Sequence, residues 1–153
     1  MPNIKLICAT IAPFTEAGDL DRDGTNTLFA SLKDSGIDYV FTPGTTAEFT
    51  SLTDDERLEI IRTALKIFGS DGVFAHVGAA TTRQAVELAK RAREIGATRL
   101  AAITPYFVTA GPTSVIDYYR ALAAVAPGAQ IYVYVFPDRA TTQVSPETLA
   151  KLA

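Results

Sequence analysis

The stretch YVFTPGTTAEFTSLTDDERLEI, residues 39–60, joins a short apolar segment to an amphipathic helical pattern through an unusually polar loop. The loop carries Gly44 and the adjacent threonines Thr45 and Thr46, although one or two turn residues would be enough for a connection. Successive backbone N–H groups in such a turn can point at one carboxylate or phosphate oxygen, and hydroxyls add further donors. The loop therefore predicts either a small anion site or a turn closed by its own threonine side chains.

The same order of apolar segment, loop and helix recurs along the chain. Capping signals mark helix starts, with a Thr-x-x-Glu capping box at 53–56, a similar pattern at 81–84 and a Ser-Pro step at 145–146. Helices are expected at about 21–35, 53–68 and 81–95, from about 113 and from 146, with apolar segments starting near residues 4, 39, 73, 99 and 131. These segments are apolar at nearly every residue, which is typical of strands covered on both faces. The alternation predicts an α/β fold with a parallel sheet.

Two architectures fit this repeat. Residues 1–153 are interpreted as a single domain whose pattern stops inside the fifth helix, at Lys151-Leu152-Ala153. A doubly wound, flavodoxin-like sheet has five strands, whereas a (β/α)₈ TIM barrel needs about 250 residues. The chain is therefore either a small flavodoxin-like domain or about the first five βα units of a TIM barrel.

Composition excludes several classes of function. Fourteen basic and 17 acidic residues give a net charge of −3, which argues against a nucleic-acid partner. No apolar run approaches the roughly 18 residues that cross a membrane. The only histidine, His76, excludes a multi-histidine metal site, and the only cysteine, Cys8, excludes an intramolecular disulfide. Since the N-terminus lacks a signal-peptide core, we expect a cytoplasmic protein with no metal and no cofactor.

Ligands of both architectures bind at the carboxyl ends of the parallel strands, and most of these ends carry hydroxyl groups here. On the last strand Tyr132, Tyr134 and Phe136 alternate with aliphatic residues, so we expect the aromatic face to point into the barrel. The Tyr134 phenol, next to a threonine hydroxyl from the second strand, could relay protons. It could equally be a core tyrosine that only needs a hydrogen-bond partner.

Three other polar or reactive residues allow both a functional and a structural interpretation. Arg139, in the loop beyond the last strand, could bind a substrate carboxylate in a bidentate manner, although most loop arginines are simply solvated. His76 is expected to fill a polar position inside the barrel rather than to act as a base. Cys8, in the middle of the first strand, is expected to be an inert core residue.

Three motifs, taken together and in order, resemble those of the dihydrodipicolinate synthase / N-acetylneuraminate lyase family of pyruvate-dependent class I aldolases. GTTAE at 44–48 resembles the family's Gly-Thr-Thr-Gly-Glu, TPYF at 104–107 its Thr-Pro-Tyr-Tyr, and YVFPDR at 134–139 its Tyr-Asn-x-Pro-x-Arg. The resemblance covers essentially the whole chain. It favours the TIM barrel and implies a homo-oligomer, either a tetramer or a dimer.

The resemblance also implies a reaction and roles for four residues. The family's enzymes are carbon–carbon lyases or synthases that hold pyruvate as a Schiff base on a lysine and add it to an aldehyde, or cleave a 2-oxo acid. Thr45 and Thr46 would bind the pyruvate carboxylate, and Thr45 would pass protons to Tyr134. Tyr134 would protonate and deprotonate the intermediates, and Arg139 would bind the far end of the aldehyde substrate.

The chain departs from the family pattern in ways that leave the substrate, the reaction direction and the oligomer size open. Phe107 stands where the synthases carry a tyrosine that reaches into a neighbouring subunit's site, and Ala47 and Val135 replace a glycine and an asparagine. The family's Schiff-base lysine lies on the sixth strand, which is expected just beyond residue 153. The alternative to a lyase is a non-catalytic, carboxylate-binding half-barrel module that dimerises.

Overall fold

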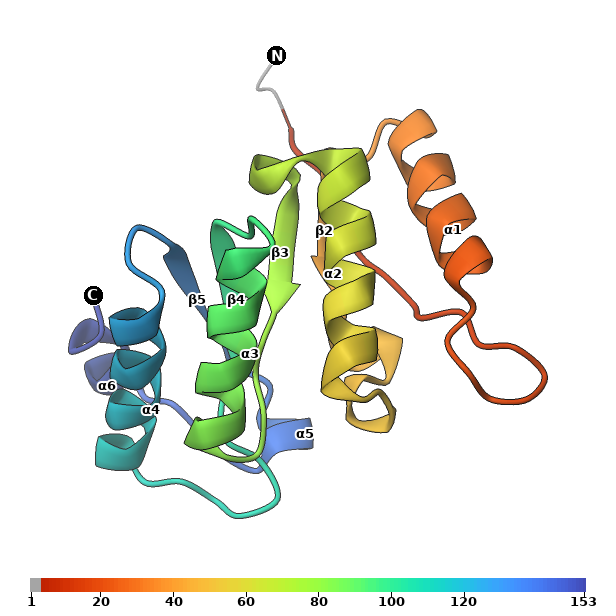
Figure 1. Ribbon diagram of the computed structural model, residues 1–153. Helices are drawn as coiled ribbons and strands as arrows, with labels where there is room; N and C mark the ends of the chain where they lie inside the picture. Colours follow the sequence, from red (N-terminus) through yellow and green to blue (C-terminus); the bar gives the residue numbers. More distant parts are fainter. Residues whose placement is uncertain (1–3) are drawn as a thin grey trace.

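The computed structural model of the protein describes residues 4–153, and its five strands form one parallel sheet in sequential order (Figure 1). The strands are β1 (Ile7–Ala9), β2 (Tyr39–Thr42), β3 (Val73–His76), β4 (Arg99–Ile103) and β5 (Gln130–Tyr134). A flavodoxin-like sheet would have the order 2-1-3-4-5, so that alternative is wrong. The sequential order confirms the prediction of the first five βα units of a TIM barrel.

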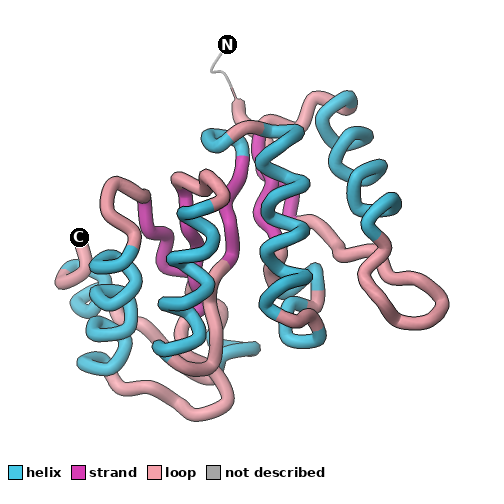
Figure 2. The backbone as a smooth tube through the Cα atoms, in the orientation of Figure 1, coloured by secondary structure: helices cyan, strands magenta, loops and turns pink. Residues whose placement is uncertain are grey.

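Helices follow the strands and cover the outer face of the sheet (Figures 1 and 2). They are α1 (Arg22–Asp34), α2 (Asp54–Phe68), α3 (Thr82–Glu94), α4 (Pro112–Val125), α5 (Pro137–Ala140) and α6 (Pro146–Ala150), with 3₁₀ turns η1 (Thr45–Ala47), η2 (Phe49–Ser51) and η3 (Ser70–Gly72). The predicted helix positions are confirmed to within a residue or two. No helix within residues 4–153 is long and apolar enough to cross a membrane.

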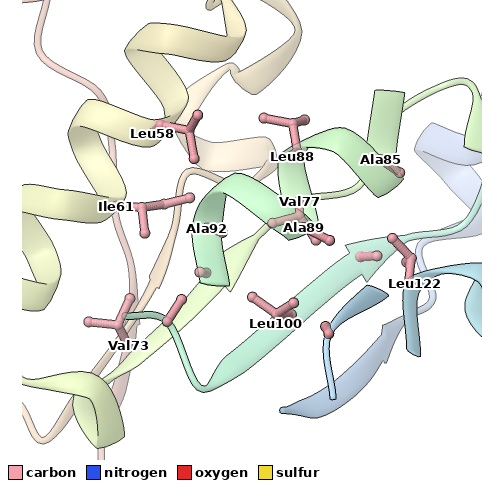
Figure 3. Close-up of a cluster of buried hydrophobic side chains, with 14 of the residues drawn as sticks. Leu58, Ile61, Val73, Val77, Ala85, Leu88, Ala89, Ala92, Leu100 and Leu122 are labelled. Atoms are coloured by element: carbon pink, nitrogen blue, oxygen red, sulfur yellow. The ribbon is translucent and has the colours of Figure 1, made fainter. Parts of the chain in front are cut away.

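The main core lies between the sheet and the helices (Figure 3). Val73 of β3 and Leu100 of β4 meet Leu58 and Ile61 of α2 and Leu88 of α3, and each of these side chains is at most 3% exposed. Burying an aliphatic side chain of this size contributes about 1.5–3 kcal/mol. This apolar layer therefore fixes how the helices sit on the sheet.

The inner face of the sheet is aromatic. The Phe74 ring packs edge-on against the Tyr132 ring, with centroids 4.8 Å apart, and the Arg99 guanidinium lies 5.5 Å from the Phe74 centroid. The neighbouring residues of β5, Ile131 and Val133, pack against the outer core instead. The alternation predicted for the last strand is thus confirmed, with its aliphatic residues toward the helices and its aromatic residues inside.

Two local predictions are corrected by the structure. Cys8 is only partly buried, because β1 is an edge strand of three residues with neighbours on one side. Arg139 lies in the short helix α5 rather than in an irregular loop. Pro137 supplies the first position of that helix, where the missing amide hydrogen has no intrahelical partner to lose.

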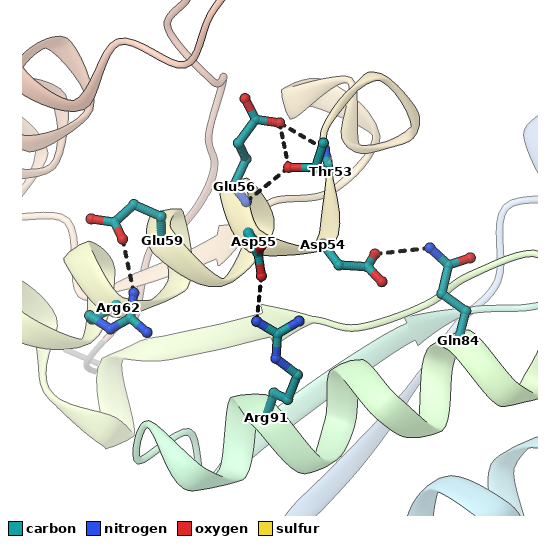
Figure 4. A network of polar contacts seen from close by, with 8 residues as sticks. All are labelled: Thr53, Asp54, Asp55, Glu56, Glu59, Arg62, Gln84 and Arg91. Atoms are coloured by element: carbon teal, nitrogen blue, oxygen red, sulfur yellow. Dashed lines mark hydrogen bonds and ion pairs between the residues drawn. The ribbon is translucent and has the colours of Figure 1, made fainter.

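Polar contacts join the start of α2 to α3 (Figure 4). Asp55 pairs with Arg91 at 2.5 Å, and the Gln84 amide donates to Asp54 at 2.9 Å. The predicted capping box at Thr53 and Glu56 is present in both directions. Because Asp55 is largely exposed and the Arg91 side chain is 37% exposed, solvent weakens the ion pair, and the cap makes the larger contribution to the stability of this end of α2.

Replacing Thr53 with alanine removes the hydroxyl that accepts from the Glu56 amide. We expect the Thr53→Ala variant to lose about 1 kcal/mol of unfolding free energy, measured by urea titration. Thr63→Ala is the matched control, because the Thr63 hydroxyl only bonds back to the Glu59 carbonyl inside the same helix. A control that loses as much stability as Thr53→Ala would contradict the capping role.

Candidate active site

Two of the residues singled out in the sequence meet at the carboxyl edge of the sheet. The Thr45 hydroxyl lies 3.1 Å from the Tyr134 phenol, in a hydrogen bond that either group can donate. Tyr134 is the last residue of β5, and Thr45 opens the turn that follows β2. The ring of Phe41, on β2, packs edge-on against the Tyr134 ring at 5.2 Å and fixes its plane.

Gly44 is required where the chain leaves β2. A Cβ atom at this position would lie 2.5 Å from Cε1 of Phe41, so a larger residue would displace the ring that supports Tyr134. The backbone of Gly44 also serves the turn, because its carbonyl accepts from the Ala47 amide at 3.1 Å. The glycine therefore brings Thr45 close to the aromatic layer.

More backbone amides of the turn donate hydrogen bonds within the turn itself than the sequence analysis predicted. The amides of Ala47, Glu48 and Phe49 all bond to carbonyls of residues 44 and 45. Within residues 4–153 this leaves the amides of Thr45 and Thr46 without a hydrogen-bond acceptor. The predicted series of free N–H groups is therefore limited to these two threonines, each of which also carries a hydroxyl.

A cavity of about 220 Å³ opens beside the Thr45–Tyr134 pair. Its walls are formed by Thr45, Glu48, Phe49, Thr50, Ile103, Tyr106 and Arg139. The structure thus brings Thr45 and Arg139 to one cavity, while Thr46 is exposed beside it and does not line it. Tyr134 does not line the cavity and reaches it only through its bond to Thr45. The Thr45 hydroxyl, the apolar wall and the Arg139 guanidinium suit a small molecule that carries a carboxylate.

Arg57 is a buried residue of this region that the sequence analysis did not single out. It extends from α2, is 2% exposed, and its guanidinium donates to the carbonyls of His76 at 3.0 Å and Gly78 at 2.9 Å. The Phe49 ring lies beneath it at 5.1 Å. Desolvation lowers the pKa of Arg57, but an arginine stays protonated in proteins. The site therefore has a buried positive charge close to its floor.

A sequence signal for this burial exists. Arg57 lies four, seven and eleven residues before Ile61, Ala64 and Phe68, which all face the core. This spacing puts Arg57 on the apolar face of α2 rather than on the charged face with its neighbour Glu56. A cation at an apolar helical position needs carbonyl or aromatic partners, and β3 and η2 supply them here.

His76 occupies the expected polar position inside the half-barrel and is fully buried. Nδ1 lies 2.9 Å from the Pro43 carbonyl, and Nε2 lies 3.2 Å from the Ile103 amide nitrogen. Because the first partner only accepts and the second only donates, the ring is a neutral imidazole protonated at Nδ1. Desolvation and the charge of Arg57 hold the pKa of His76 well below its usual range.

The described residues offer no group of three or more His, Cys, Asp or Glu side chains that could hold a metal ion. All five lysines lie on the surface, at positions 5, 33, 66, 90 and 151. Lys5 pairs with Asp38, and this contact raises the Lys5 pKa. A lysine that attacks a carbonyl needs a desolvated amine with a lowered pKa. Within residues 4–153, the chain therefore supplies hydroxyls and guanidinium groups to the site but no such amine.

A sequential parallel sheet with a cavity at the carboxyl ends of its strands defines the first part of a TIM barrel. Comparison with known proteins identifies the family. The sequence profile of the Dihydrodipicolinate synthetase family matches residues 3–153, and the chain belongs to this family.

The relatives are named for two related activities. The chain is 37% identical over 150 residues to a 4-hydroxy-tetrahydrodipicolinate synthase of Acidothermus cellulolyticus, covering 97% of this chain and 48% of the relative. It is 35% identical over 144 residues to an uncharacterized DapA-like lyase of Halobacterium salinarum, covering 94% of this chain and 47% of the relative. The chain thus spans about half the length of the curated relatives it matches.

Solved structures agree with the architecture. The dihydrodipicolinate synthase of Aquifex aeolicus superimposes with a TM-score of 0.88 at 30% identity, over 97% of this chain and 50% of that structure. A sialic acid aldolase of Ruminococcus gnavus also gives a TM-score of 0.88, over 96% of this chain and 48% of that structure. Because its identity is only 22%, the second likeness concerns the fold alone.

The burial of His76 predicts a pH dependence of stability. Its folded-state pKa is depressed, so below about pH 6.5 the unfolded chain binds a proton that the native state excludes. The unfolding free energy should therefore fall as the pH drops below about 6.5, with a slope approaching about 1.4 kcal/mol per pH unit. Urea titrations at pH 7.5, 6.5 and 5.5 measure this fall.

His76→Asn is the control for this experiment, because the chain has no other histidine. Its unfolding free energy should change much less over the same pH interval. An equal fall in the variant and the parent would show that other groups carry the dependence.

Proposed function

We propose that the chain forms the carboxylate-binding and proton-transfer part of a carbon–carbon lyase or synthase that acts through a pyruvate Schiff base. The hydrogen bond between Tyr134 and Thr45, which lines a cavity together with Arg139, carries this proposal. The names of the relatives support the class of reaction. The nucleophilic lysine would lie outside this chain, on the next strand of the barrel.

The roles follow from the chemistry of the groups. Thr45 and Thr46 would bind the pyruvate carboxylate through their hydroxyls and the two free amides of the turn. The Tyr134 phenol would deliver and remove protons, with the Thr45 hydroxyl as its relay. Arg139, which lines the same cavity as Thr45, would bind the distal carboxylate or hydroxyl of an aldehyde or 2-oxo acid substrate.

The protein is proposed to act as a homo-oligomer, either a tetramer or a dimer. Phe107 is 90% exposed at the tip of the loop between β4 and α4, in a left-handed conformation with φ 75°, and Val108 beside it is 72% exposed. An apolar tip of this kind fits burial by a neighbouring subunit. Since Phe107 has no hydroxyl, it would close the neighbour's site without extending a proton relay.

The alternative is a non-catalytic half-barrel that binds a carboxylate and dimerises. Apolar side chains are exposed around β1, where Ile4, Leu6 and Ile7 are 76%, 52% and 56% exposed. Their exposure favours a protein in which further structure covers this edge of the sheet. The remaining strands of a barrel, or a second half-barrel, would cover this edge equally well. The two functions differ in whether pyruvate becomes covalently bound.

Reductive trapping distinguishes the lyase from the binding module. Borohydride converts an imine between lysine and pyruvate to a stable amine, which peptide mass spectrometry locates. Residues 1–153 alone should gain no pyruvate mass, since their lysines are on the surface. A longer protein that contains this chain and the next strand should gain one adduct, roughly 25–30 residues after Tyr134, given the βα repeat. The absence of an adduct on the longer protein would favour the binding module.

Tyr134→Phe tests the proton-transfer role in the longer protein. The variant keeps the ring contacts and loses the phenol, so we expect the fold to persist and kcat to fall by about 10²–10⁴-fold. Tyr132→Phe is the matched control, because Tyr132 lies on the same face and its hydroxyl bonds only to the exposed Gln130 side chain. Steady-state kinetics should find the control within about threefold of the parent, far from the loss expected of a proton-transfer group, because the Tyr132 phenol bonds to Gln130 and not to Thr45. A Tyr134→Phe enzyme that turns over as fast as the control would remove the phenol from the mechanism.

A further inference from the structure

We propose that His76 is a positioning residue that sets the separation of Thr45 and Tyr134, because one imidazole bonds the ends of both β2 and β4. The inference rests on the proposed function, since it concerns the pair assigned to proton transfer. His76 itself is fully buried and does not line the cavity, so it does not touch the substrate.

The first bond controls the threonine side of the pair. Nδ1–H of His76 donates to the Pro43 carbonyl at 2.9 Å. Pro43 lies two residues before Thr45, and the intervening Gly44 carbonyl already accepts from the turn. The position of the Thr45 hydroxyl therefore depends on where the imidazole holds this carbonyl.

The second bond controls the tyrosine side. Nε2 of His76 accepts from the Ile103 amide at 3.2 Å. Ile103 is the direct neighbour of Tyr134 in the register of β4 and β5, and the Thr104 amide donates to the Tyr134 carbonyl at 3.2 Å. A shift of Ile103 would move Tyr134 with it. The two imidazole nitrogens thus connect, through short backbone segments, the two hydroxyl groups that lie 3.1 Å apart.

Close packing holds the imidazole in this orientation. The Phe49 ring meets it edge-on at 4.6 Å, and the Phe41 ring lies 5.8 Å from it while also contacting Tyr134. The Phe49 ring is held in turn by its contact with the Arg57 guanidinium. Rotation of the imidazole would therefore disturb the Phe49 ring, which lines the cavity, and the Phe41 ring, which supports Tyr134.

Gly78 makes the second bond possible. A Cβ atom on Gly78 would lie 2.5 Å from the Ile103 nitrogen and 2.8 Å from Nε2 of His76. The carbonyl of the same residue accepts from Arg57. The charge of Arg57 opposes a second proton on the ring, so Nε2 keeps the lone pair that the Ile103 amide needs.

Three variants of the longer protein separate the two bonds. His76→Phe keeps a ring and removes both bonds, His76→Asn can keep a donor near the Nδ1 position, and His76→Gln can keep an acceptor near the Nε2 position. We expect His76→Phe to lower kcat by about 10–100-fold below its melting temperature, since small displacements of reacting groups have effects of this size. His76→Asn and His76→Gln should fall between His76→Phe and the parent.

The pH profile and a stability control separate positioning from acid–base catalysis and from a loss of stability. The variants should keep both limbs of the kcat–pH profile, whereas the loss of a limb would identify His76 as an acid or base and overturn the proposal. Leu88→Ala is the stability control, because Leu88 lies in the outer core. It should lower the melting temperature and leave kcat within about threefold of the parent. A folded His76→Phe enzyme with a kcat as high as this control would also overturn the proposal.

A structural measurement keeps this inference separate from the proposed function. If the parent forms no borohydride-trapped adduct, the lyase assignment fails and kinetics cannot be used. The crystal structure of His76→Phe then decides, or that of His76→Asn if the first variant does not fold. A Thr45–Tyr134 separation beyond hydrogen-bonding distance supports the positioning role, and an unchanged separation overturns it.

Discussion

The parallel alignment of the strands is the constraint on which the site depends. In a parallel sheet every strand ends at the same edge, so residues that follow different strands become neighbours. Thr45 and Tyr134 are 89 positions apart in the chain and share a hydrogen bond for this reason. The register of β4 and β5, with Ile103 opposite Tyr134, then decides which residue of β5 reaches the threonine turn.

One face of the sheet packs against the helices and stabilises the fold, while the other face carries the residues of the candidate site. The outer face of β5 packs Ile131 and Val133 against the helices, while Tyr134 and Phe136 contact a separate inner cluster. A shift of one residue in this strand would exchange the two sets, placing phenols in the apolar core and aliphatic residues in the site. The packing of the helices therefore also protects the geometry of the hydroxyl pair.

Local patterns in the sequence were sufficient for the five strands, the longer helices and the direction of the Tyr134 side chain, but not for the short helix α5. Capping residues gave the helix starts, and a period of two gave the inner face of β5. The contacts of His76 and Arg57 could not be predicted in this way, because their partners are carbonyls and amides supplied by other strands. The exposure of Cys8 escaped prediction for a different reason, since it depends on how many neighbours β1 has.

The charges near the site are mutually consistent only if His76 is neutral. Arg57 is buried without an ion-pair partner in the described part of the chain. Two carbonyl groups accept from its Nη2 and the Phe49 ring lies against it, while its Nε has no hydrogen-bond partner among the described residues. A protonated imidazole in contact with that guanidinium would put two cations together in a site of low dielectric constant, at a large electrostatic cost.

With His76 neutral, Arg57 near the floor and Arg139 on the wall leave a net positive environment in which the Glu48 carboxylate is the opposing charge of the lining. Such an environment favours a small carboxylate close to the threonine turn. The same neutrality keeps an acceptor at Nε2, so the electrostatics that attract an anion and the bonds that position Thr45 and Tyr134 depend on one protonation state.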